Sequence, residues 1–585
     1  MTWLIYAALA IGAFFILKWR FRKVRSEYGS AQWLPPWTAA RRGLFGFSGI
    51  PLGEWGWTHL PVRFHDDGHI LTVAPPGGGK SATGSIPSGL DRRIKSRFIA
   101  DPDGEVSAVC IDAWRRDGDN VFIINPAKMF PEAPWSLPAH KFDPMSFVNP
   151  EAPDFAKRAN YIASTLITRS GADDGSTEYF KAEATNKLAA FIAFGALKGV
   201  RLPAIRNWIG LPDVGEGVLN SDYPNQTALW DAMAAEPAID GMIARQAVDL
   251  RDKRENAPAE FQAVFSTVRS AMSFLDDPSM REALSADEVD WQALKTGRCV
   301  IAVVMPRQDW KIFAPFVRLA FLSAVWALEQ GPVASHRIHM LLEEFPTLGR
   351  MDFFSDVLAT ARKKKAQIEV VIQNLGQIEA LYPEWKALLP NFEVRRFKAV
   401  RDIDTARYVC GALGTGTRVY KDINKPAQRN LLSRQLLTPD EVMAMPKDRQ
   451  IVFIGNNRPA WLGQYPYWER ISLRRRALPS PYYPGGLPAL PEGALTRWLA
   501  GQGLRVLSFI TGPHPQAVIA ALALLIWWSD PLVLIAEEKN WAARELSCTH
   551  IGWKGPKSTH LKNARENTFC NALVVWDKGF ALGRR

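Results

Sequence analysis

Seven short apolar segments, each bounded by turn residues, recur through the middle of the chain. They lie at residues 70–73, 98–100, 121–124, 299–304, 338–342, 368–372 and 451–454. Continuous apolar runs of this length are typical of strands that are covered on both faces. Because helical patterns lie between several of them, the sequence predicts an α/β fold with a mainly parallel sheet.

Residues 161–290 follow a different pattern. Strand-like runs stop there, and helical periodicity takes over in segments such as 179–195 and 257–274. The simplest interpretation is an all-helical insertion at residues 161–290. It would divide the α/β domain into a first part, residues 28–160, and a second part, residues 291–475.

The first residues predict a membrane helix. Residues 2–17 carry no charged side chain, and five basic residues follow directly: Lys18, Arg20, Arg22, Lys23 and Arg25. A signal peptide would carry its positive charge before the apolar run. Charge after the run favours a single-pass anchor within residues 1–27, with the N-terminus outside and the bulk of the chain cytoplasmic. An amphipathic or packed helix is the alternative.

Residues 476–585 are predicted to be a linker and a tail of unknown role. Residues 478–491 are dense in proline and glycine, which is typical of a linker. The apolar run at 517–528 is short for a membrane span and favours a buried or interfacial helix, with a second membrane contact as the alternative. The last 45 residues follow neither period clearly, so this C-terminal extension is expected to be irregular.

Composition limits the classes of protein that fit. The chain has 585 residues, 47% hydrophobic and 22% charged, which suits two to four domains and excludes global disorder. Of the net charge of +12, residues 1–45 contribute +6 and residues 541–585 contribute +5, leaving +1 for the body. Any nucleic-acid contact must therefore come from local patches. Five scattered cysteines lack metal-ligand spacing and fit buried thiols in a reducing cytosol.

A glycine-rich loop follows the first apolar run. It reads Ala74-Pro75-Pro76-Gly77-Gly78-Gly79-Lys80-Ser81, a phosphate-binding loop with alanine in place of its first glycine. Residues Pro76 to Ser81 are the candidate contacts with ATP: backbone N–H groups wrap the phosphates, and the lysine reaches the terminal ones. The serine hydroxyl is a candidate ligand of Mg²⁺. An incidental glycine-rich turn is the alternative.

Polar residues end two further predicted strands. After residues 338–342, Glu343 would hold the Mg²⁺ shell and Glu344 would polarise a water towards the γ-phosphate. After residues 368–372, Gln373 would sense the γ-phosphate or orient that water, although a polar turn also fits. Strand ends of one parallel sheet share an edge, so these groups and Lys80 should converge on one crevice. Lys80, Glu344 and Gln373 are thus the candidate catalytic residues.

Six segments resemble the coupling proteins of type IV secretion and conjugative DNA transfer. They are YGSAQW (28–33), HILTVAPPGGGKSATGSIPSGL (69–90), FIADPDGEVSAV (98–109), LLEEFPTLGRMDFFSDVLATAR (341–362), VVIQNLGQIEALYP (370–383) and LLTPDEVMAMPKDRQIVFI (436–454), in the family's order. The resemblance implies a RecA-like P-loop ATPase that is anchored in the inner membrane as a homo-hexamer. It also implies that the protein brings DNA, with a relaxase or other secreted protein, to a type IV channel.

The sequence departs from this family in three places. The family usually has two N-terminal membrane helices and this sequence has one; Glu343 stands where the family has Asp, and Asp103 stands where it often has Lys. The last two departures keep open a non-hydrolysing membrane receptor that only docks cargo. A chromosome-type double-stranded DNA translocase is the other alternative, which the helical insertion argues against.

Two basic groups are candidates for contact with DNA phosphates. One is Arg362 to Lys365; the other is Arg395, Arg396, Lys398 and Arg401. A basic loop that faces the pore of a ring motor would track DNA without reading its sequence. Solvated helix faces are the alternative, and one arginine of the second group would instead act on ATP held by a neighbouring subunit.

Overall fold

The computed structural model describes residues 27–46, 48–56, 60–168, 175–215, 221–421, 429–483 and 485–490, and five strands between residues 531 and 582. The chain divides into two compact units, residues 1–36 with 46–501 and residues 37–45 with 502–585. The predicted anchor at residues 2–17 and the apolar run at 517–528 lie outside the described residues. Within the described part, no helix is long and apolar enough to span a membrane.

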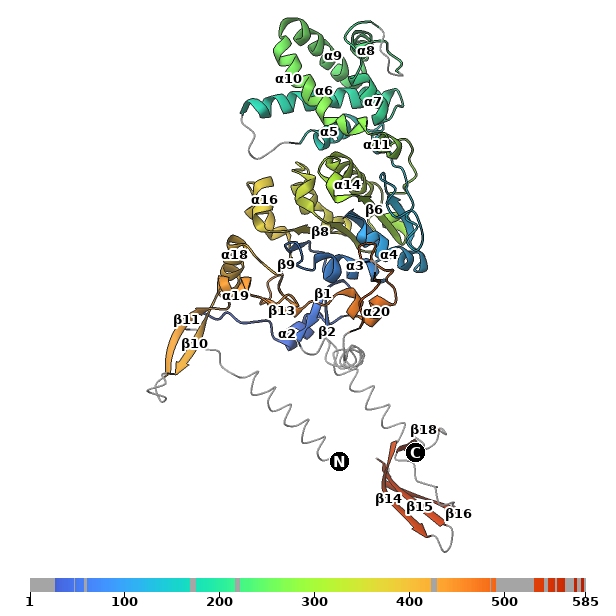
Figure 1. Ribbon diagram of the computed structural model, residues 1–585, viewed down its shortest axis with the longest axis vertical. Coiled ribbons are helices and arrows are strands. Elements are labelled where there is room, and N and C mark those ends of the chain that lie inside the picture. The colour runs from blue at the N-terminus through green and yellow to red at the C-terminus, as the bar shows by residue number, and fades with distance from the viewer. Residues whose placement is uncertain are drawn as a thin grey trace. The chain divides into compact units, whose positions relative to one another are not determined.

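The first unit is built on an eleven-stranded sheet (Figure 1). Seven neighbouring strands are parallel, in the order β9 (Val394–Lys398), β3 (Ile70–Val73), β8 (Ala366–Ile372), β7 (Ile338–Leu342), β4 (Ser96–Pro102), β6 (Cys299–Met305) and β5 (Asn120–Ile124). Antiparallel strands continue the sheet beyond β9: β12 (Arg449–Ile454), β13 (Ala460–Gly463), β1 (Ile50–Trp55) and β2 (Leu60–Phe64).

All seven predicted strands are present, six of them in the parallel part and one, β12, in the antiparallel part. The prediction of a mainly parallel α/β sheet is therefore confirmed. Four strands of this sheet were missed. Strand β9 carries three basic residues, and β1 and β2 are interrupted by proline or glycine, so these three lack the apolar run that marks a buried strand. The fourth, β13, is apolar but only four residues long.

Helices cover both faces of the sheet, and alternate strand residues face opposite layers because the side-chain period of a strand is two. On one face, Ile99 and Val300 pack with α3 (Ile86–Leu90) and α4 (Glu105–Arg116). On the other, Phe98 and Ile301 pack in a cluster that includes α14 (Ala314–Glu329), α15 (Phe354–Thr360) and α16 (Leu375–Leu381). This second cluster continues into the helices between β5 and β6.

Between β5 and β6 the described residues form helices and no strand. The α-helices are α5 (Phe155–Leu166), α6 (Gly175–Leu197), α7 (Leu202–Ile209), α8 (Gln226–Ala234), α9 (Ala238–Asn256), α10 (Pro258–Ala271), α11 (Pro278–Ala283) and the short α12 (Ala293–Thr296), most of them green in Figure 1. The expected all-helical region is therefore present between β5 and β6. The boundaries at residues 161 and 290 stay predictions, since one hydrophobic cluster joins these helices to the sheet.

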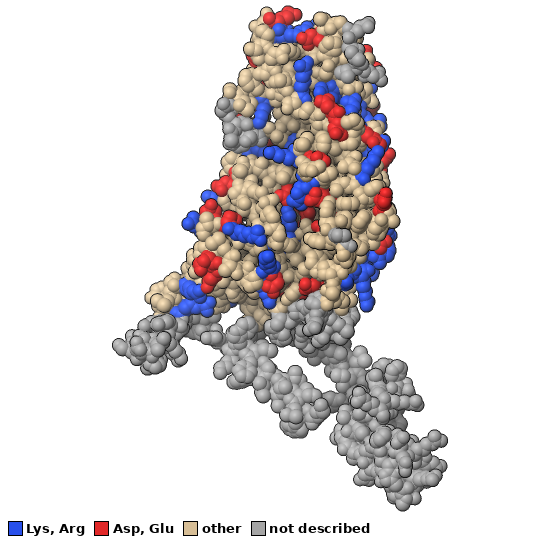
Figure 2. All heavy atoms as spheres, viewed as in Figure 1, with Lys and Arg blue, Asp and Glu red and all other residues tan. Residues whose placement is uncertain are grey.

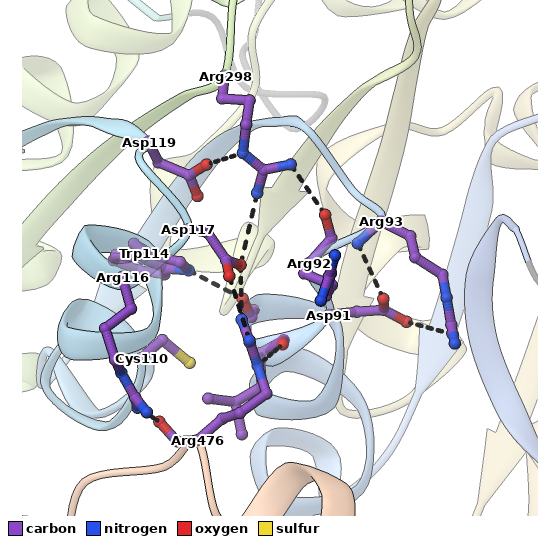
Figure 3. A network of polar contacts seen from close by, with 12 residues as sticks. Asp91, Arg92, Arg93, Cys110, Trp114, Arg116, Asp117, Asp119, Arg298 and Arg476 are labelled. Atoms are coloured by element: carbon purple, nitrogen blue, oxygen red, sulfur yellow. Dashed lines mark hydrogen bonds and ion pairs between the residues drawn. The ribbon is translucent and has the colours of Figure 1, made fainter.

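A short segment at residues 476–482, which we call the C-terminal strap, lies along α4. Arg476 pairs with Asp117 at the C-cap of α4, and Asp117 also contacts Arg298, as Figure 3 shows. The Leu478 N–H donates to the Val109 carbonyl at 2.9 Å. Near its other end, the Tyr482 hydroxyl donates to the Asp103 carbonyl at 2.6 Å. The predicted linker thus begins as a segment attached to the α/β domain.

Strands also occur outside the main sheet. Strands β10 (Thr415–Lys421) and β11 (Arg429–Gln435) form an antiparallel hairpin in the first unit. The second unit contains a five-stranded antiparallel sheet in the order β16 (Gly555–Lys562), β15 (Glu545–Gly552), β14 (Pro531–Asn540), β17 (Leu573–Val575) and β18 (Phe580–Leu582). The expectation of an irregular C-terminal extension is corrected here, because polar residues interrupt the period-two pattern that would have marked these strands.

Candidate functional site

The phosphate-loop sequence connects β3 to a helical segment at the carboxyl edge of the sheet. The Ala74 N–H donates to the Ile372 carbonyl at 2.9 Å, which keeps the chain beside β8 as it leaves β3. Gly77 and Gly79 have φ angles of 72° and 77°, in the region that glycine adopts without strain. Apart from its chain neighbours, Gly77 has no described atom closer than 3.9 Å to the place where a Cβ would stand, and the residue is exposed. The loop therefore leaves its backbone accessible to a ligand at Gly77.

The helix after the loop fixes the peptide before Lys80. The Thr83 hydroxyl donates to the Gly79 carbonyl at 2.6 Å, and the Lys398 ammonium donates to the Thr83 hydroxyl at 2.8 Å. With its carbonyl held towards the helix η2 (Ser81–Ser85), the Gly79–Lys80 peptide presents its N–H on the opposite side. Such N–H groups at a helix start are suited to anion binding.

Glu343 lies at the base of this loop. It follows β7, is 2% exposed, and accepts hydrogen bonds from the Ser81 hydroxyl at 3.4 Å and from Ser85. Burial raises the pKa of Glu343, and the Ser85 hydrogen bond and the Lys80 ammonium oppose that rise. The predicted pair Ser81 and Glu343 is thus in contact, with two oxygens of the kind that Mg²⁺ prefers.

Glu344 contacts three hydrogen-bond donor side chains, each of which follows a different strand. Its carboxylate pairs with Lys80, accepts a hydrogen bond from the Gln373 amide, and lies 3.2 Å from Nη1 of Arg307. Burial alone would raise the pKa of Glu344, but these groups, Lys80 foremost, hold it below its ordinary value. The residue adopts φ 53°, a strained conformation for a side chain with a Cβ. The three predicted catalytic residues are therefore in contact, since Lys80 and Gln373 both bind the Glu344 carboxylate.

Three further groups at this edge were not assigned a role from the sequence. Asp101 lies next to the last residue of β4 and accepts from the Ser107 N–H of α4 at 2.7 Å. Burial and the neighbouring Glu343 raise its pKa to about 8. Ser85 contacts Glu343, and Arg307 follows β6. Extending the strand-end rule to the runs at 98–100 and 299–304 would have found Asp101 and Arg307.

We use the name strand-end cluster for Lys80, Glu343, Glu344, Gln373, Arg307 and Asp103. Its members follow β3, β7, β8, β6 and β4, which are the five adjacent strands β3-β8-β7-β4-β6. Because parallel strands end at one edge, these side chains are delivered to one place. Asn374, by contrast, accepts from the Gln377 N–H at 3.1 Å and caps α16, which is a structural role.

The second basic group differs from the predicted exposed patch. Arg396 and Lys398 are 1% and 0% exposed, so they do not contact DNA in this state. Their strand is covered by the helix after the phosphate loop, which a sequence pattern rich in basic residues does not reveal. Arg401 is exposed, and its Nη2 lies 3.9 Å from the Cβ position of Gly77. An arginine of this group therefore lies beside the phosphate loop of its own chain.

The first basic group is largely exposed at the end of α15, on the 3-10 turn η6 (Ala361–Lys364). Lys365 lies 3.4 Å from Asp67, and Arg362 lies 3.7 Å from Glu393. Figure 2 shows basic and acidic side chains intermixed on the face in view, with no broad field of one sign. Of the cysteines, Cys110, Cys299 and Cys410 are free and buried, as expected.

Comparison with known proteins identifies relatives over most of the first unit. The model of a family described as type IV secretory system conjugative DNA transfer matches residues 45–484. Protein VirD4 of Agrobacterium fabrum is 24% identical over 449 residues, which cover 71% of this chain and 61% of VirD4. The conjugal transfer protein TraG of Escherichia coli is 24% identical over 486 residues, which cover 74% of this chain and 73% of TraG. The chain thus spans less than two thirds of the VirD4 length.

Solved structures share the fold. The bacterial conjugative coupling protein TrwBdeltaN70, in a trigonal form with sulphate, superposes with a TM-score of 0.53 at 14% identity, covering 76% of this chain and 95% of that one. Plasmid coupling protein TrwB in complex with the ATP analogue ADPNP gives a TM-score of 0.52 at 15% identity, covering 72% and 92%. These likenesses confirm the predicted RecA-like α/β architecture.

Proposed function

The chain belongs to the type IV secretory system conjugative DNA transfer family, and from that premise we propose that it is an ATP-driven coupling protein. In this proposal it recruits DNA–protein substrates and pumps them to a type IV secretion or conjugation channel. The observation that carries the proposal is the meeting of Lys80, Glu344 and Gln373 at one sheet edge, beside an open phosphate loop.

The residues of the loop suit Mg²⁺-ATP as the substrate. Backbone N–H groups of residues 76–81 would hold the phosphates, and Lys80 would leave Glu344 to contact the terminal phosphate oxygens. Ser81 and Glu343 would hold Mg²⁺, directly or through water, and the ion would neutralise charge on the phosphates. The names of the TrwB structures with ADPNP and with ADP and Mg²⁺ support this choice for a protein of the same fold.

Glu344 would act on the attacking water. Once Lys80 engages the phosphates, the Glu344 carboxylate is free to accept a hydrogen bond from a water in line with the γ-phosphate. Gln373, already bonded to the same carboxylate, would orient that water or sense the γ-phosphate. The left-handed backbone of Glu344 fits this role, since strain of this kind persists where the surroundings hold a functional group in place.

The partners and location are proposed from the family. They are DNA bound without sequence preference, a relaxase or other secreted protein, the type IV channel, and a homo-hexamer anchored in the inner membrane by a single N-terminal helix. The name of the TraG relative, a conjugal transfer protein, supports the link to conjugation. Among basic residues, Lys363 and Lys364 on η6 are the candidates for the DNA track, because Arg396 and Lys398 are buried.

One experiment tests the class of function. Full-length protein in detergent or nanodiscs is assayed for Mg²⁺-dependent phosphate release, with and without single-stranded or double-stranded DNA. Glu344→Gln serves as the control for contaminating ATPase. The proposal expects hydrolysis that DNA increases and that this variant abolishes. A native protein that binds cargo but releases no phosphate would instead be a docking receptor, and stimulation by duplex alone would favour a chromosome-type translocase.

A further inference from the structure

Arg307 and Asp103 form a two-contact pair at the strand-end cluster. The Arg307 Nε lies 2.7 Å from Asp103 Oδ2, and the Arg307 backbone N–H donates to Asp103 Oδ1 at 2.9 Å. Both carboxylate oxygens of Asp103 are therefore used by one residue. One of the two terminal nitrogens of the guanidinium, Nη1, lies 3.2 Å from Glu344 Oε2. The arginine thus bridges two carboxylates that follow different strands.

Asp103 is itself held in place from several directions. Its N–H donates to the Met305 carbonyl at 3.0 Å, and its carbonyl accepts from the Tyr482 hydroxyl of the C-terminal strap. The residue adopts φ 71°, so the turn between β4 and α4 is strained at this point. An aspartate that is fixed in this way gives Arg307 a fixed direction, although the arginine side chain is 49% exposed.

We expect the contacts of Glu344 to change when phosphate binds. Among the described residues, Lys80 and Arg307 are the two cations on this carboxylate, and Gln373 is the neutral donor. A phosphate-loop lysine that moves to the nucleotide leaves Arg307 as the cation still facing Glu344. Because Arg307 is restrained by Asp103 and not by the loop, its contact does not depend on the position of Lys80.

We propose that Arg307 is a positioning residue for ATP hydrolysis, holding the Glu344 carboxylate towards the attacking water while the phosphates engage Lys80, and that Asp103 acts through Arg307. This inference rests on the proposed function. It also explains the acidic residue at position 103, because the negative charge of Asp103 orients the guanidinium of Arg307, which follows β6. The nucleotide keeps its binding contacts with the loop, so the effect falls on turnover and not on affinity.

The alternative is an ion pair that contributes only to local structure. A pair this exposed adds little to stability in that case, and turnover would not depend on it. Arg201 offers a matched control. Its side chain is 48% exposed, close to the 49% of Arg307, and its Nε lies 2.9 Å from Asp143 Oδ2 in the helical region. Arg201→Gln removes a comparable pair without touching the strand-end cluster.

The test is steady-state ATP hydrolysis by the full-length protein, with kcat and KM measured separately and ATP-analogue binding measured by fluorescence. Arg307→Gln should lower kcat by up to about 100-fold, as expected when a reacting group is misplaced by about 1 Å, and leave KM and analogue affinity within about threefold. Asp103→Asn should lower kcat less, Arg307→Lys should recover part of it, and Arg201→Gln should leave it unchanged.

A double-mutant cycle separates action through Glu344 from any other effect. Adding Arg307→Gln to Glu344→Gln should cost nothing further, because the carboxylate to be positioned is already gone. Losses that multiply, or an Arg307→Gln variant whose kcat stays within twofold of native, would overturn the inference while leaving the proposed function intact. A native protein with no ATP hydrolysis at all would overturn both, so the two failures are distinct.

Discussion

Charged side chains cluster at two places in the main sheet, one inside the strands and one at their carboxyl ends. One group, which we call the mid-sheet cluster, consists of Thr72, His339, Glu369 and Arg396 within β3, β7, β8 and β9. The Glu369 carboxylate accepts from the Thr72 hydroxyl at 2.9 Å and lies 3.1 Å from His339 Nε2 and 3.6 Å from Arg396 Nη1. The strand-end cluster lies at the carboxyl edge of strands of this same sheet.

The two clusters differ in backbone and in access to solvent, not in charge pairing. His339, Glu369 and Arg396 are at most 2% exposed and lie on regular strands. In the strand-end cluster, Glu343 and Glu344 are also buried, but the Lys80 side chain is 13% exposed and that of Arg307 49%. Glu344 and Asp103 have left-handed backbones. Buried ion pairs alone therefore do not identify a site. A ligand needs partners that it can reach and displace, and of these two clusters the one at the sheet edge offers them.

The largest effect is expected for Lys80→Ala. The change removes a cation from the phosphates and should lower turnover by at least about 10²–10³-fold, and it should weaken ATP binding as well. Stability should stay close to native, since Arg307 and Gln373 still contact the Glu344 carboxylate when Lys80 is removed. Phosphate release, analogue binding and thermal unfolding measure these three quantities. If Lys80→Ala destabilises the protein as much as Glu369→Gln does, the two clusters do not differ in their contribution to stability.

Glu344→Gln should separate binding from turnover. The amide keeps the shape of the carboxylate but does not take a proton from water, so kcat should fall by about 10²–10⁴-fold. ATP should stay bound and accumulate on the protein, unlike in Lys80→Ala. Filter retention of labelled ATP, followed by identification of the bound nucleotide, measures the trapped state. Hydrolysis at the native rate would remove Glu344 from the water-polarising role.

Glu369→Gln should have the opposite profile. Burial by itself raises the pKa of Glu369, but Arg396, with His339 and Thr72, lowers it to about 2. Neutralising this residue leaves Arg396 buried without its charged partner, which should cost about 3 kcal/mol of unfolding free energy at pH 7. KM for ATP should remain near native below the unfolding temperature. Urea unfolding and ATP hydrolysis at low temperature measure the two effects.

The lowered pKa of Glu369 also predicts how the stability difference between native protein and Glu369→Gln depends on pH. A folded pKa of about 2, below the ordinary 4.5, means that Glu369 contributes stability above pH 4.5 and loses it as the pH falls towards 2. The difference in unfolding free energy between native protein and Glu369→Gln should therefore be larger at pH 7 than at pH 4. A difference that stays constant between these pH values would mean that the ionised carboxylate is not what stabilises the mid-sheet cluster.

The sequence predicts the strand-end cluster better than the mid-sheet cluster, for a physical reason. Lys80 lies in a glycine-rich loop, and Glu344 and Gln373 lie at the ends of apolar runs. Local sequence patterns therefore identify all three residues. Glu369 and Arg396 are charges inside strands. Their burial depends on elements packed over the sheet, such as η2, whose Gly84 lies against the Arg396 guanidinium, and no local pattern encodes this packing. The strand-end rule places Arg307 at this edge, just beyond the run at 299–304, but its contacts with Asp103 and Glu344 join segments far apart in the chain and have no local signature.

The smallest effect is expected for Glu343→Asp. This carboxylate is buried against Ser81 and Ser85, and shortening it by one methylene opens a gap at their hydroxyls. Mg²⁺ usually keeps several of its waters, so a water would fill the gap and link the shorter side chain to the ion. Turnover should fall by less than about tenfold, which corresponds to less than about 1.4 kcal/mol.

Glu343→Ala provides the contrast, because it removes the carboxylate altogether. The ion would then be left with Ser81 and nucleotide oxygens, and Mg²⁺-dependent turnover should fall far more than in Glu343→Asp. Measuring phosphate release against Mg²⁺ concentration for native, Asp and Ala variants tests the assignment. If the Ala variant remains fully active, Glu343 belongs with the mid-sheet charges, as a buried group that stabilises the fold and takes no part in the site. If only the Ala variant needs more Mg²⁺, the carboxylate holds the ion, and the boundary between the two clusters lies inside β7, between His339 and Glu343.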